Sequence, residues 1–305
     1  MNDKWIWWKH GVIYQIYPRS FYDSNGDGIG DIPGIIEKLD YLKDLGIDAI
    51  WLSPVNTSPM YDFGYDISNY REIDPVFGSK KDFRDLIKEA HARDIKIIMD
   101  MVLNHTSHLH QWFIESRSSL DSPKRDWYIW RDGKKGKPPN NWIAAFGGSS
   151  WEKDESSGQY YLHSFLKEQP DVNWRNNELR DAMYSEMRYW LDHGVDGFRL
   201  DVVNWFVKDG DFRNNPPSLR PQQLQKHRFD RNRPETHEIM KEIRTVVDSY
   251  RDRMTVGEVF SLPPGDPKLS ASYLGDGSDE LHLAFDFSLL YKWWNARTVY
   301  RTIRR

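Results

Sequence analysis

The stretch Ile95-Lys96-Ile97-Ile98-Met99-Asp100-Met101-Val102 is apolar at positions that would face both sides of a pleated strand. A strand of this kind fits a parallel sheet that is covered on both faces. Similar short apolar runs lie before and after it in the chain, and we expect further strands at 12–17, 47–52, 195–201, 254–260 and 282–287.

Helical patterns fill the intervals between these runs. Apolar residues recur at helical spacing over 32–45, just before Gly46, and again over 83–90, 179–191 and 238–250. Alternating strands and helices predict an α/β fold with a parallel sheet. The sheet is either doubly wound or closed as a (β/α)8 TIM barrel, with about six of eight strands in this chain. No Gly-x-Gly-x-x-Gly motif follows the first predicted strand, which weighs against dinucleotide binding.

A long interruption separates the third predicted strand from the fourth. Residues 104–173 are rich in Trp, Gly, Pro and Ser, and they are too numerous for an ordinary connection. We expect a small domain inserted after strand three, between a first barrel part at 1–103 and a continuation at 174–305.

Composition argues against several classes of protein. The 42 basic and 46 acidic residues are interleaved and give a net charge of -4, so we expect no nucleic-acid partner. No apolar run approaches the length of a membrane helix, so we expect no membrane partner. The chain has no cysteine, which excludes disulfides, thiolate nucleophiles and Cys-ligated zinc and suits the cytoplasmic location that we expect.

Carboxylates stand at the ends of three successive predicted strands: Asp100, Asp201 and Glu258. Because the carboxyl ends of barrel strands meet on the face where active sites are built, we expect these side chains to lie together. A single acid at such a place could simply cap a helix or pair with an arginine. Three in succession are harder to explain in that way.

Two carboxylates in different environments suit glycoside hydrolysis, which needs an ionised nucleophile and a protonated acid. Arg199 lies two positions before Asp201, hence on the same face of a strand, where its guanidinium favours an ionised carboxylate. Apolar neighbours of Glu258 would raise its pKa by desolvation. Metal-assisted hydrolysis is the competing hypothesis, but the histidines lack a tight ligand spacing.

Three short segments resemble signatures of the α-amylase family of glycoside hydrolases, and the resemblance extends over the whole chain. The segments are 100–105 (DMVLNH), 197–201 (GFRLD) and 257–260 (GEVF). The resemblance implies a (β/α)8 barrel with a small domain inserted after the third strand.

The same resemblance implies roles for individual residues. Asp201 would be the nucleophile and Glu258 the acid/base of a retaining reaction, with their carboxyl groups roughly 5 Å apart. Arg199 would orient the nucleophile. The residues implied to bind the sugar are Asp62, Tyr65, His105, Phe146 and Phe165, although core packing is an equal alternative for the two phenylalanines.

Two further features bear on specificity. Residues 169–174 (QPDVNW) resemble the variant typical of the oligo-1,6-glucosidase and α-glucosidase subgroup. Val202, directly after the expected nucleophile, resembles the residue often found with α-1,6 preference. The implied function is a retaining, exo-acting α-glucosidase for α-1,4 and/or α-1,6 bonds of short oligosaccharides, with a lean to α-1,6.

The segment 23–31 (DSNGDGIGD) spaces oxygen-bearing residues in the way a flexible loop wraps a hard cation. It is not an EF-hand, because Gly34 stands where a bidentate Glu is needed and a predicted strand precedes the loop. In the family this loop resembles a structural Ca²⁺ site, and an ion-free turn is the alternative. The expected ligands are Asp23, Asn25, Asp27, the Ile29 carbonyl and Asp31.

The family's fourth signature, which follows the seventh strand and supplies a third catalytic acid, has no counterpart in this sequence. We therefore expect the chain to stop before strands seven and eight and a C-terminal β-domain, and to need a complementary C-terminal fragment. A transglycosylase or sucrose isomerase of the same family remains an alternative, because it would share these acids. A non-catalytic binding or transport-accessory relative would be expected to lack them.

Overall fold

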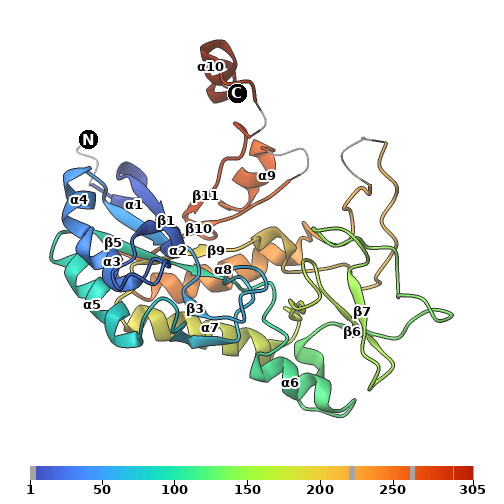
Figure 1. Ribbon diagram of the computed structural model, residues 1–305. Coiled ribbons are helices and arrows are strands. Elements are labelled where there is room, and N and C mark those ends of the chain that lie inside the picture. The colour runs from blue at the N-terminus through green and yellow to red at the C-terminus, as the bar shows by residue number, and fades with distance from the viewer. Residues whose placement is uncertain (1–4, 220–223, 262–264, 291, 305) are drawn as a thin grey trace.

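A six-stranded parallel sheet lies at the centre of the computed structural model, which describes residues 5–219, 224–261, 265–290 and 292–304 (Figure 1). Its order is β1-β2-β5-β9-β10-β11, and all neighbouring strands run parallel. The strands are β1 (Ile13–Ile16), β2 (Ala49–Leu52), β5 (Lys96–Met101), β9 (Gly197–Leu200), β10 (Met254–Gly257) and β11 (Leu283–Ala284). The predicted parallel α/β architecture is confirmed, with strands shorter than expected.

Helices alternate with these strands and lie together along one side of the sheet (Figure 1). They are α3 (Ile32–Glu37), α4 (Leu39–Asp44), α5 (Lys80–His91), α7 (Asn177–Asp192) and α8 (Glu235–Asp248). Side chains define where they begin: Ser79 and Asp82 form a capping box at α5, and Asn176 caps α7. The helical structure predicted over 32–45 is confirmed, as the two helices α3 and α4. It is divided at Lys38, whose N–H bonds to the carbonyl of Ile35 in a tighter turn.

Shorter elements complete the first part of the chain. A two-stranded hairpin, which the sequence patterns missed, joins β2 to α5 and carries the segment around Asp62. These elements are α1 (Trp7–His10), α2 (Pro18–Phe21), β3 (Asn56–Thr57) and β4 (Asn69–Ile73).

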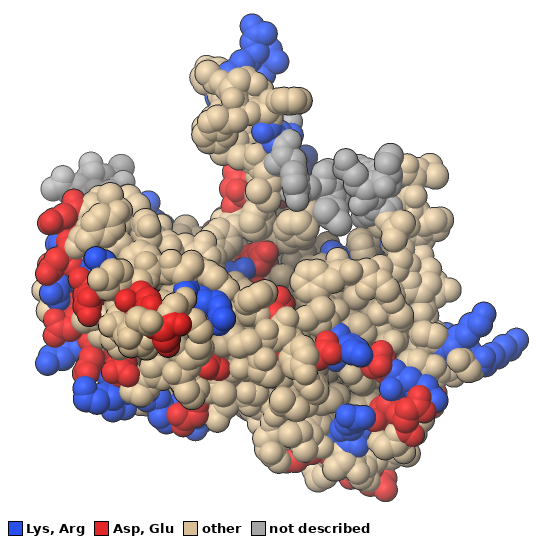
Figure 2. Space-filling model, viewed as in Figure 1, with Lys and Arg blue, Asp and Glu red and all other residues tan. Residues whose placement is uncertain are grey.

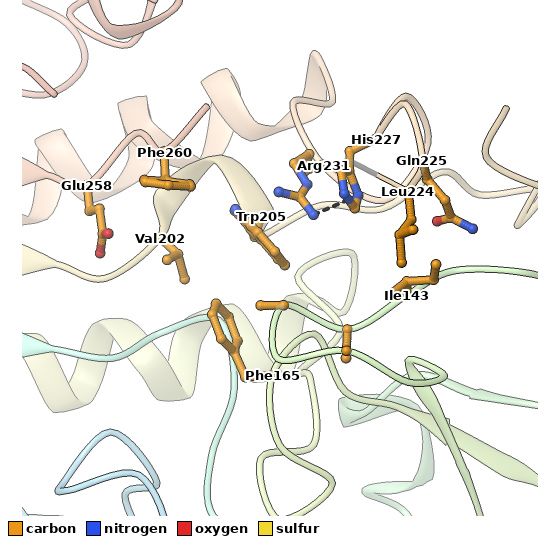
Figure 3. Close-up of a pocket in the computed structure, with 13 residues that line it drawn as sticks. Ile143, Phe165, Val202, Trp205, Leu224, Gln225, His227, Arg231, Glu258 and Phe260 are labelled. Atoms are coloured by element: carbon orange, nitrogen blue, oxygen red, sulfur yellow. Dashed lines mark hydrogen bonds between the residues drawn. The ribbon is translucent and has the colours of Figure 1, made fainter. Parts of the chain in front are cut away.

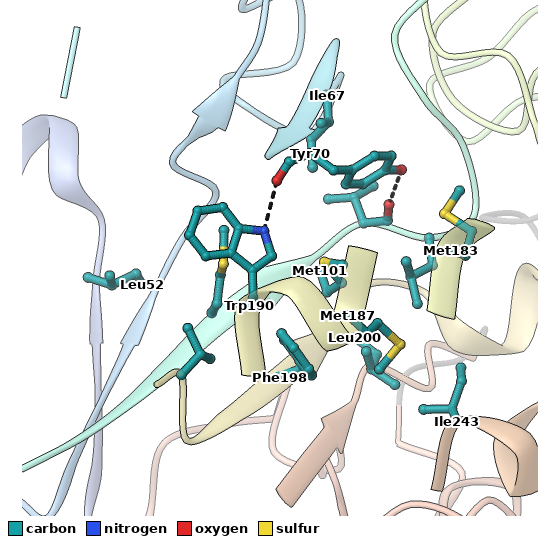
Figure 4. Close-up of a cluster of buried hydrophobic side chains, with 14 of the residues drawn as sticks. Leu52, Ile67, Tyr70, Met101, Met183, Met187, Trp190, Phe198, Leu200 and Ile243 are labelled. Atoms are coloured by element: carbon teal, nitrogen blue, oxygen red, sulfur yellow. Dashed lines mark hydrogen bonds between the residues drawn. The ribbon is translucent and has the colours of Figure 1, made fainter. Parts of the chain in front are cut away.

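The core between the sheet and α7 is built on Trp190 (Figure 4). Its indole is buried and donates to the carbonyl of Tyr70 at 2.8 Å, while the Tyr70 hydroxyl donates to the carbonyl of Val102 at 2.7 Å. The polar ends of both large rings are thus satisfied inside an apolar cluster. These contacts tie the hairpin, α7 and the end of β5 to one another.

Residues 104–173 leave the sheet at the end of β5 and return there. The Val172 amide bonds to the carbonyl of Asn104, and His105 pairs with Asp171 in an isolated bridge. Between these points lies a separate three-stranded antiparallel sheet in the order β6-β8-β7. The elements of this segment are α6 (Gln111–Ser118), η1 (Arg125–Trp127), β6 (Trp130–Arg131), β7 (Trp151–Lys153) and β8 (Tyr160–Leu162).

The last part of the chain projects from the sheet at the top of Figure 1, where α10 stands apart from the rest. It contains α9 (Pro267–Ser272) and α10 (Ala296–Ile303). Acidic and basic side chains are mixed over the visible face of the molecule (Figure 2). Within the described part of the chain, every helix is too short or too polar to cross a bilayer.

Candidate active site

Three carboxylates gather where strands β5, β9 and β10 end. Asp100 is the last residue but one of β5, Asp201 follows β9 directly, and Glu258 follows β10 directly. The parallel register places Asp100 beside Arg199. The prediction that the strand-end acids lie together is therefore confirmed, because adjacent parallel strands end at the same edge.

One guanidinium joins these three carboxylates. Arg199 Nη1 donates to Asp201 Oδ1 at 2.7 Å and to the Asp100 oxygens at 2.9 and 3.1 Å. Its Nη2 donates to Glu258 Oε2. Arg199 is only 6% exposed, so these charge-assisted bonds form out of contact with bulk water. The arginine fixes the relative positions of all three acids.

Burial sets the protonation of the site. Desolvation, with the nearby charge of Asp201, raises the pKa of Glu258 to about 7. Desolvation likewise raises the pKa of Asp100 to about 6, although Arg199 opposes the shift. Burial opposes the charge of Arg199, but the surrounding carboxylates raise its pKa well above its usual range. A carboxyl group that keeps its proton near neutral pH is suited to act as an acid.

A cavity of about 260 Å³ opens above these groups. It brings together every residue predicted for catalysis or sugar binding, which are Asp62, Tyr65, His105, Phe146, Phe165, Arg199, Asp201, Val202 and Glu258. Phe146 is 63% exposed at the rim, and its ring contacts that of Phe165. Both phenylalanine side chains thus face the cavity and not the core.

Hydrogen bonds hold the walls of this sugar-sized cavity. The Tyr65 hydroxyl donates to Asp100 Oδ2 at 3.3 Å, and His105 Nε2 lies 3.1 Å from the Tyr65 carbonyl. Gln169, which we did not predict as a site residue, donates to Asp62 Oδ2 at 2.9 Å. Its only signal in the sequence is its place at the start of the 169–174 segment.

A second cavity of about 380 Å³ lies next to Glu258 (Figure 3). It shares Phe165, Val202 and Glu258 with the first, and most of its remaining lining is apolar. The Arg231 guanidinium lies 3.5 Å above the ring of Trp205, and its Nη2 lies 2.8 Å from His227 Nδ1. The lining residues that sequence reasoning missed are Ile143, Ala144, Ala145, Gly147, Trp205, Leu224, Gln225, His227, Arg231 and Phe260.

Val202 adopts a conformation that is rare for its residue type. It has φ 37° and ψ 48°, in the left-handed region, at the start of η2 (Val203–Trp205). A β-branched residue is strained there, and such strain is found mainly at functional sites. The turn directs the chain away from Asp201 and places the Val202 side chain between the two cavities.

The predicted calcium loop forms an exposed turn before α3. Asp23 accepts backbone N–H bonds from Asn25, Gly26 and Gly28, and these bonds lower its pKa. Asp31 is the N-cap of α3 and accepts from Gly34. In the described residues no three His, Asp or Glu side chains gather as a metal-binding group. Carboxylate oxygens keep further lone pairs beside these bonds, so the donor set is compatible with Ca²⁺, and the site stays a prediction.

Comparisons with known proteins place this geometry in a family. The family description "Alpha amylase, catalytic domain" matches residues 15–302. An oligo-1,6-glucosidase of Parageobacillus thermoglucosidasius is 53% identical over 282 residues, which are 92% of this chain and 50% of that protein.

Two solved structures are also similar. The α-glucosyl transfer enzyme XgtA is 45% identical with a TM-score of 0.94, covering 99% of this chain and 58% of that one. The isomaltulose synthase SmuA of Protaminobacter rubrum is 44% identical with a TM-score of 0.87, covering 98% and 54%. The chain thus spans about half the length of these relatives, and the family's (β/α)8 barrel accounts for its six parallel strands.

Proposed function

This chain belongs to the α-amylase family of glycoside hydrolases, and on that premise we propose that it supplies the reacting groups of a retaining, exo-acting α-glucosidase. Its substrates would be short oligosaccharides with α-1,4 and/or α-1,6 bonds, with a lean to α-1,6. One observation carries the proposal: a single buried guanidinium binds Asp100, Asp201 and Glu258 at the floor of a sugar-sized cavity.

The reaction would follow the two-step course of retaining glycosidases. Asp201 attacks the anomeric carbon while Glu258 gives its proton to the leaving oxygen, and the glycosidic bond breaks. Glu258, now ionised, takes a proton from water, which attacks the glucosyl-enzyme and releases Asp201. A Glu258 pKa of about 7 supports its acid and base roles in turn.

The terminal glucose would lie in the 260 Å³ cavity, where Asp62, Tyr65 and His105 line the walls. Its small volume supports exo action, because the cavity suits one sugar ring and not a continuing chain. The larger apolar cavity beside Glu258 would receive the leaving group.

Transfer to an acceptor other than water is the second candidate. XgtA and SmuA, whose names describe glucosyl transfer and isomaltulose synthesis, support it. The cavity lined by Phe165, Trp205 and Phe260 also supports it, since a bound acceptor there would stand next to Glu258. A non-catalytic sugar-binding protein is the alternative of another class.

We further propose Ca²⁺ in the 23–31 loop as a stabilising ion. Its oxygens would come from Asp23, Asn25, Asp27, the Ile29 carbonyl and Asp31, and hard oxygen ligands suit this cation. A cytoplasmic location is a separate proposal. It is tested by following the native protein through cell fractionation.

The test uses the intact protein that contains this chain, with p-nitrophenyl α-glucoside, maltose, isomaltose and sucrose, and NMR identifies the anomer first released. We expect the intact protein to release α-glucose and the Asp201→Asn variant to release none. Asp40→Asn, a change to an exposed carboxylate outside the site, is the matched control. Isomerised sucrose or longer glucosides would establish the transfer reaction. Sugar binding without turnover in a folded protein would reject the catalytic proposal.

A further inference from the structure

Lys208 is a charged residue in a place where charge is costly. It is 1% exposed, just after η2, and burial lowers its pKa. All three of its ammonium hydrogens have oxygen acceptors: Asp171 Oδ2 at 2.6 Å, Asn104 Oδ1 at 2.8 Å and the Trp205 carbonyl. A fully satisfied buried ion pair costs folding free energy, so a functional reason for its presence is worth seeking.

The ammonium determines which way the Asn104 amide faces. Lys208 has only donors, so the atom of Asn104 opposite it must be the carbonyl oxygen. The amide nitrogen then faces the other way, toward Asp171 Oδ1 at 3.2 Å and His105 Nδ1 at 3.1 Å. Both charged neighbours of Asn104 therefore select the same orientation of its side chain.

The Asn104 amide in turn selects one tautomer of His105. An amide N–H that points at Nδ1 requires this nitrogen to be unprotonated, so the ring proton lies on Nε2. The opposite side of the ring agrees, because Nε2 lies 3.1 Å from the Tyr65 carbonyl, which can only accept. Gln169 Nε2 is also close, at 3.1 Å, but its hydrogens have acceptors in Asp62 and the Tyr65 carbonyl.

We propose that Lys208 is a positioning residue for the sugar site: through Asn104 it fixes His105 as the tautomer protonated on Nε2, whose N–H is donated to the Tyr65 carbonyl at the wall of the cavity. The functional part of this inference rests on the proposed glycosidase function; the tautomer does not. That bond would hold His105 and Tyr65, which both line the cavity, in one arrangement relative to the sugar. Lys208 touches none of the reacting groups and would act only through Asn104.

Magic-angle-spinning NMR of the intact protein, labelled with ¹⁵N in its histidine rings, reads the tautomer directly. The His105 signal is assigned from its loss in His105→Gln. The wild-type protein should show His105 protonated on Nε2. Lys208→Met should leave a mixture of tautomers and lower kcat/KM by about 10- to 100-fold, the worth of one hydrogen bond with a charged group.

Asn104→Asp keeps an acceptor for Lys208 and removes the amide hydrogens. If Lys208→Met does not fold, this variant still tests whether the Asn104 amide sets the tautomer of His105. A carboxylate there should draw the proton of His105 to Nδ1. Arg117→Met is the matched control, since Arg117 pairs with the buried Asp154 at 2.7 Å in the same inserted segment and has no contact with His105. It should leave the tautomer unchanged.

Two results would overturn the inference: His105 protonated on Nδ1 in the wild-type protein, or protonated on Nε2 in all variants. Neither depends on turnover. Failure of the proposed glycosidase function would appear separately. The wild-type protein would then show the expected tautomer but release no sugar from any α-glucoside.

Discussion

Gln169 donates an amide hydrogen to Asp62 Oδ2 at 2.9 Å, although 107 positions of sequence separate the two residues. Gln169 is fully buried, and its own oxygen accepts from the Leu166 amide, so the amide group has one orientation. The inserted segment thus reaches back to hold a wall of the sugar cavity that the β3–β4 hairpin supplies. The first prediction follows from this bond.

Gln169→Met should raise KM for p-nitrophenyl α-glucoside about 5- to 10-fold with little change in kcat. The lost hydrogen bond holds Asp62, the carboxylate proposed to bind the sugar, and it is remote from the bond that would break. Its loss should therefore weaken binding of the ground state and the transition state alike. Steady-state kinetics measure both constants. Gln159→Met, which removes an amide that bonds Asp132 and Arg125 away from the site, should leave both unchanged.

Activity should fall as pH rises through about 7. Glu258 must carry a proton to protonate the leaving group, and its pKa is raised to about 7, so the acid form is present below that pH and lost above it. A kcat/KM profile of the intact protein measures this limb. Glu258→Gln should remove the limb together with most of the activity. A rate that stays constant to pH 9 would contradict the acid role.

Arg199→Met should lower kcat/KM by about 100- to 1000-fold, because the charge and the hydrogen bonds that hold Asp201 and Glu258 in position are both lost. Arg199 also lowers the pKa of Glu258, so removing it should move the alkaline limb of residual activity to higher pH. Circular dichroism distinguishes this effect from loss of fold. An alkaline limb that moves to lower pH in the variant would contradict the proposal that Arg199 lowers the pKa of Glu258.

Val202→Ala should reduce the ratio of isomaltose to maltose hydrolysis by about 10-fold at most. Val202 lies between the two cavities, and one or two methyl groups in an apolar pocket discriminate only weakly. Parallel kcat/KM measurements on the two disaccharides give the ratio. Leu224→Ala, which changes the far end of the larger cavity, is the control for a general widening of the leaving-group cavity.

Chelation by EDTA should lower the melting temperature by a few degrees without changing kcat at 25 °C, since the 23–31 loop lies apart from the cavities. Asp23→Ala should reproduce the shift and abolish the response to EDTA. Thermal unfolding with and without added Ca²⁺ is the measurement. A melting temperature that is the same in EDTA and Ca²⁺ would show that the loop binds no stabilising ion.

The sheet and the cluster of strand-end acids could be predicted because both leave a local pattern. Strands covered on two faces are continuously apolar, as 95–102 is, and barrel acids stand where those runs end. The ends of these runs were predicted less well: residues 254–260 read as one strand, but the strand ends at Gly257. The run at 282–287 gives only two strand residues, Leu283 and Ala284, which pair with β10.

The supporting residues left no such pattern. Lys208 reads as a surface lysine, and only its three-dimensional neighbours show that it is buried and fully bonded. Gln169, Trp205 and Arg231 reach the cavities through long-range contacts that no periodicity encodes. The residues proposed to react are therefore easier to predict from the sequence than the residues that hold them in place.

The shared guanidinium has an electrostatic consequence. One basic group is bonded to three acidic groups, so acids outnumber bases in a place sheltered from water. The excess of acidic groups would stabilise a neutral sugar little. It would stabilise an anomeric carbon increasingly as positive charge develops there. We therefore expect the cavity to bind a protonated amine of sugar size more tightly than it binds glucose.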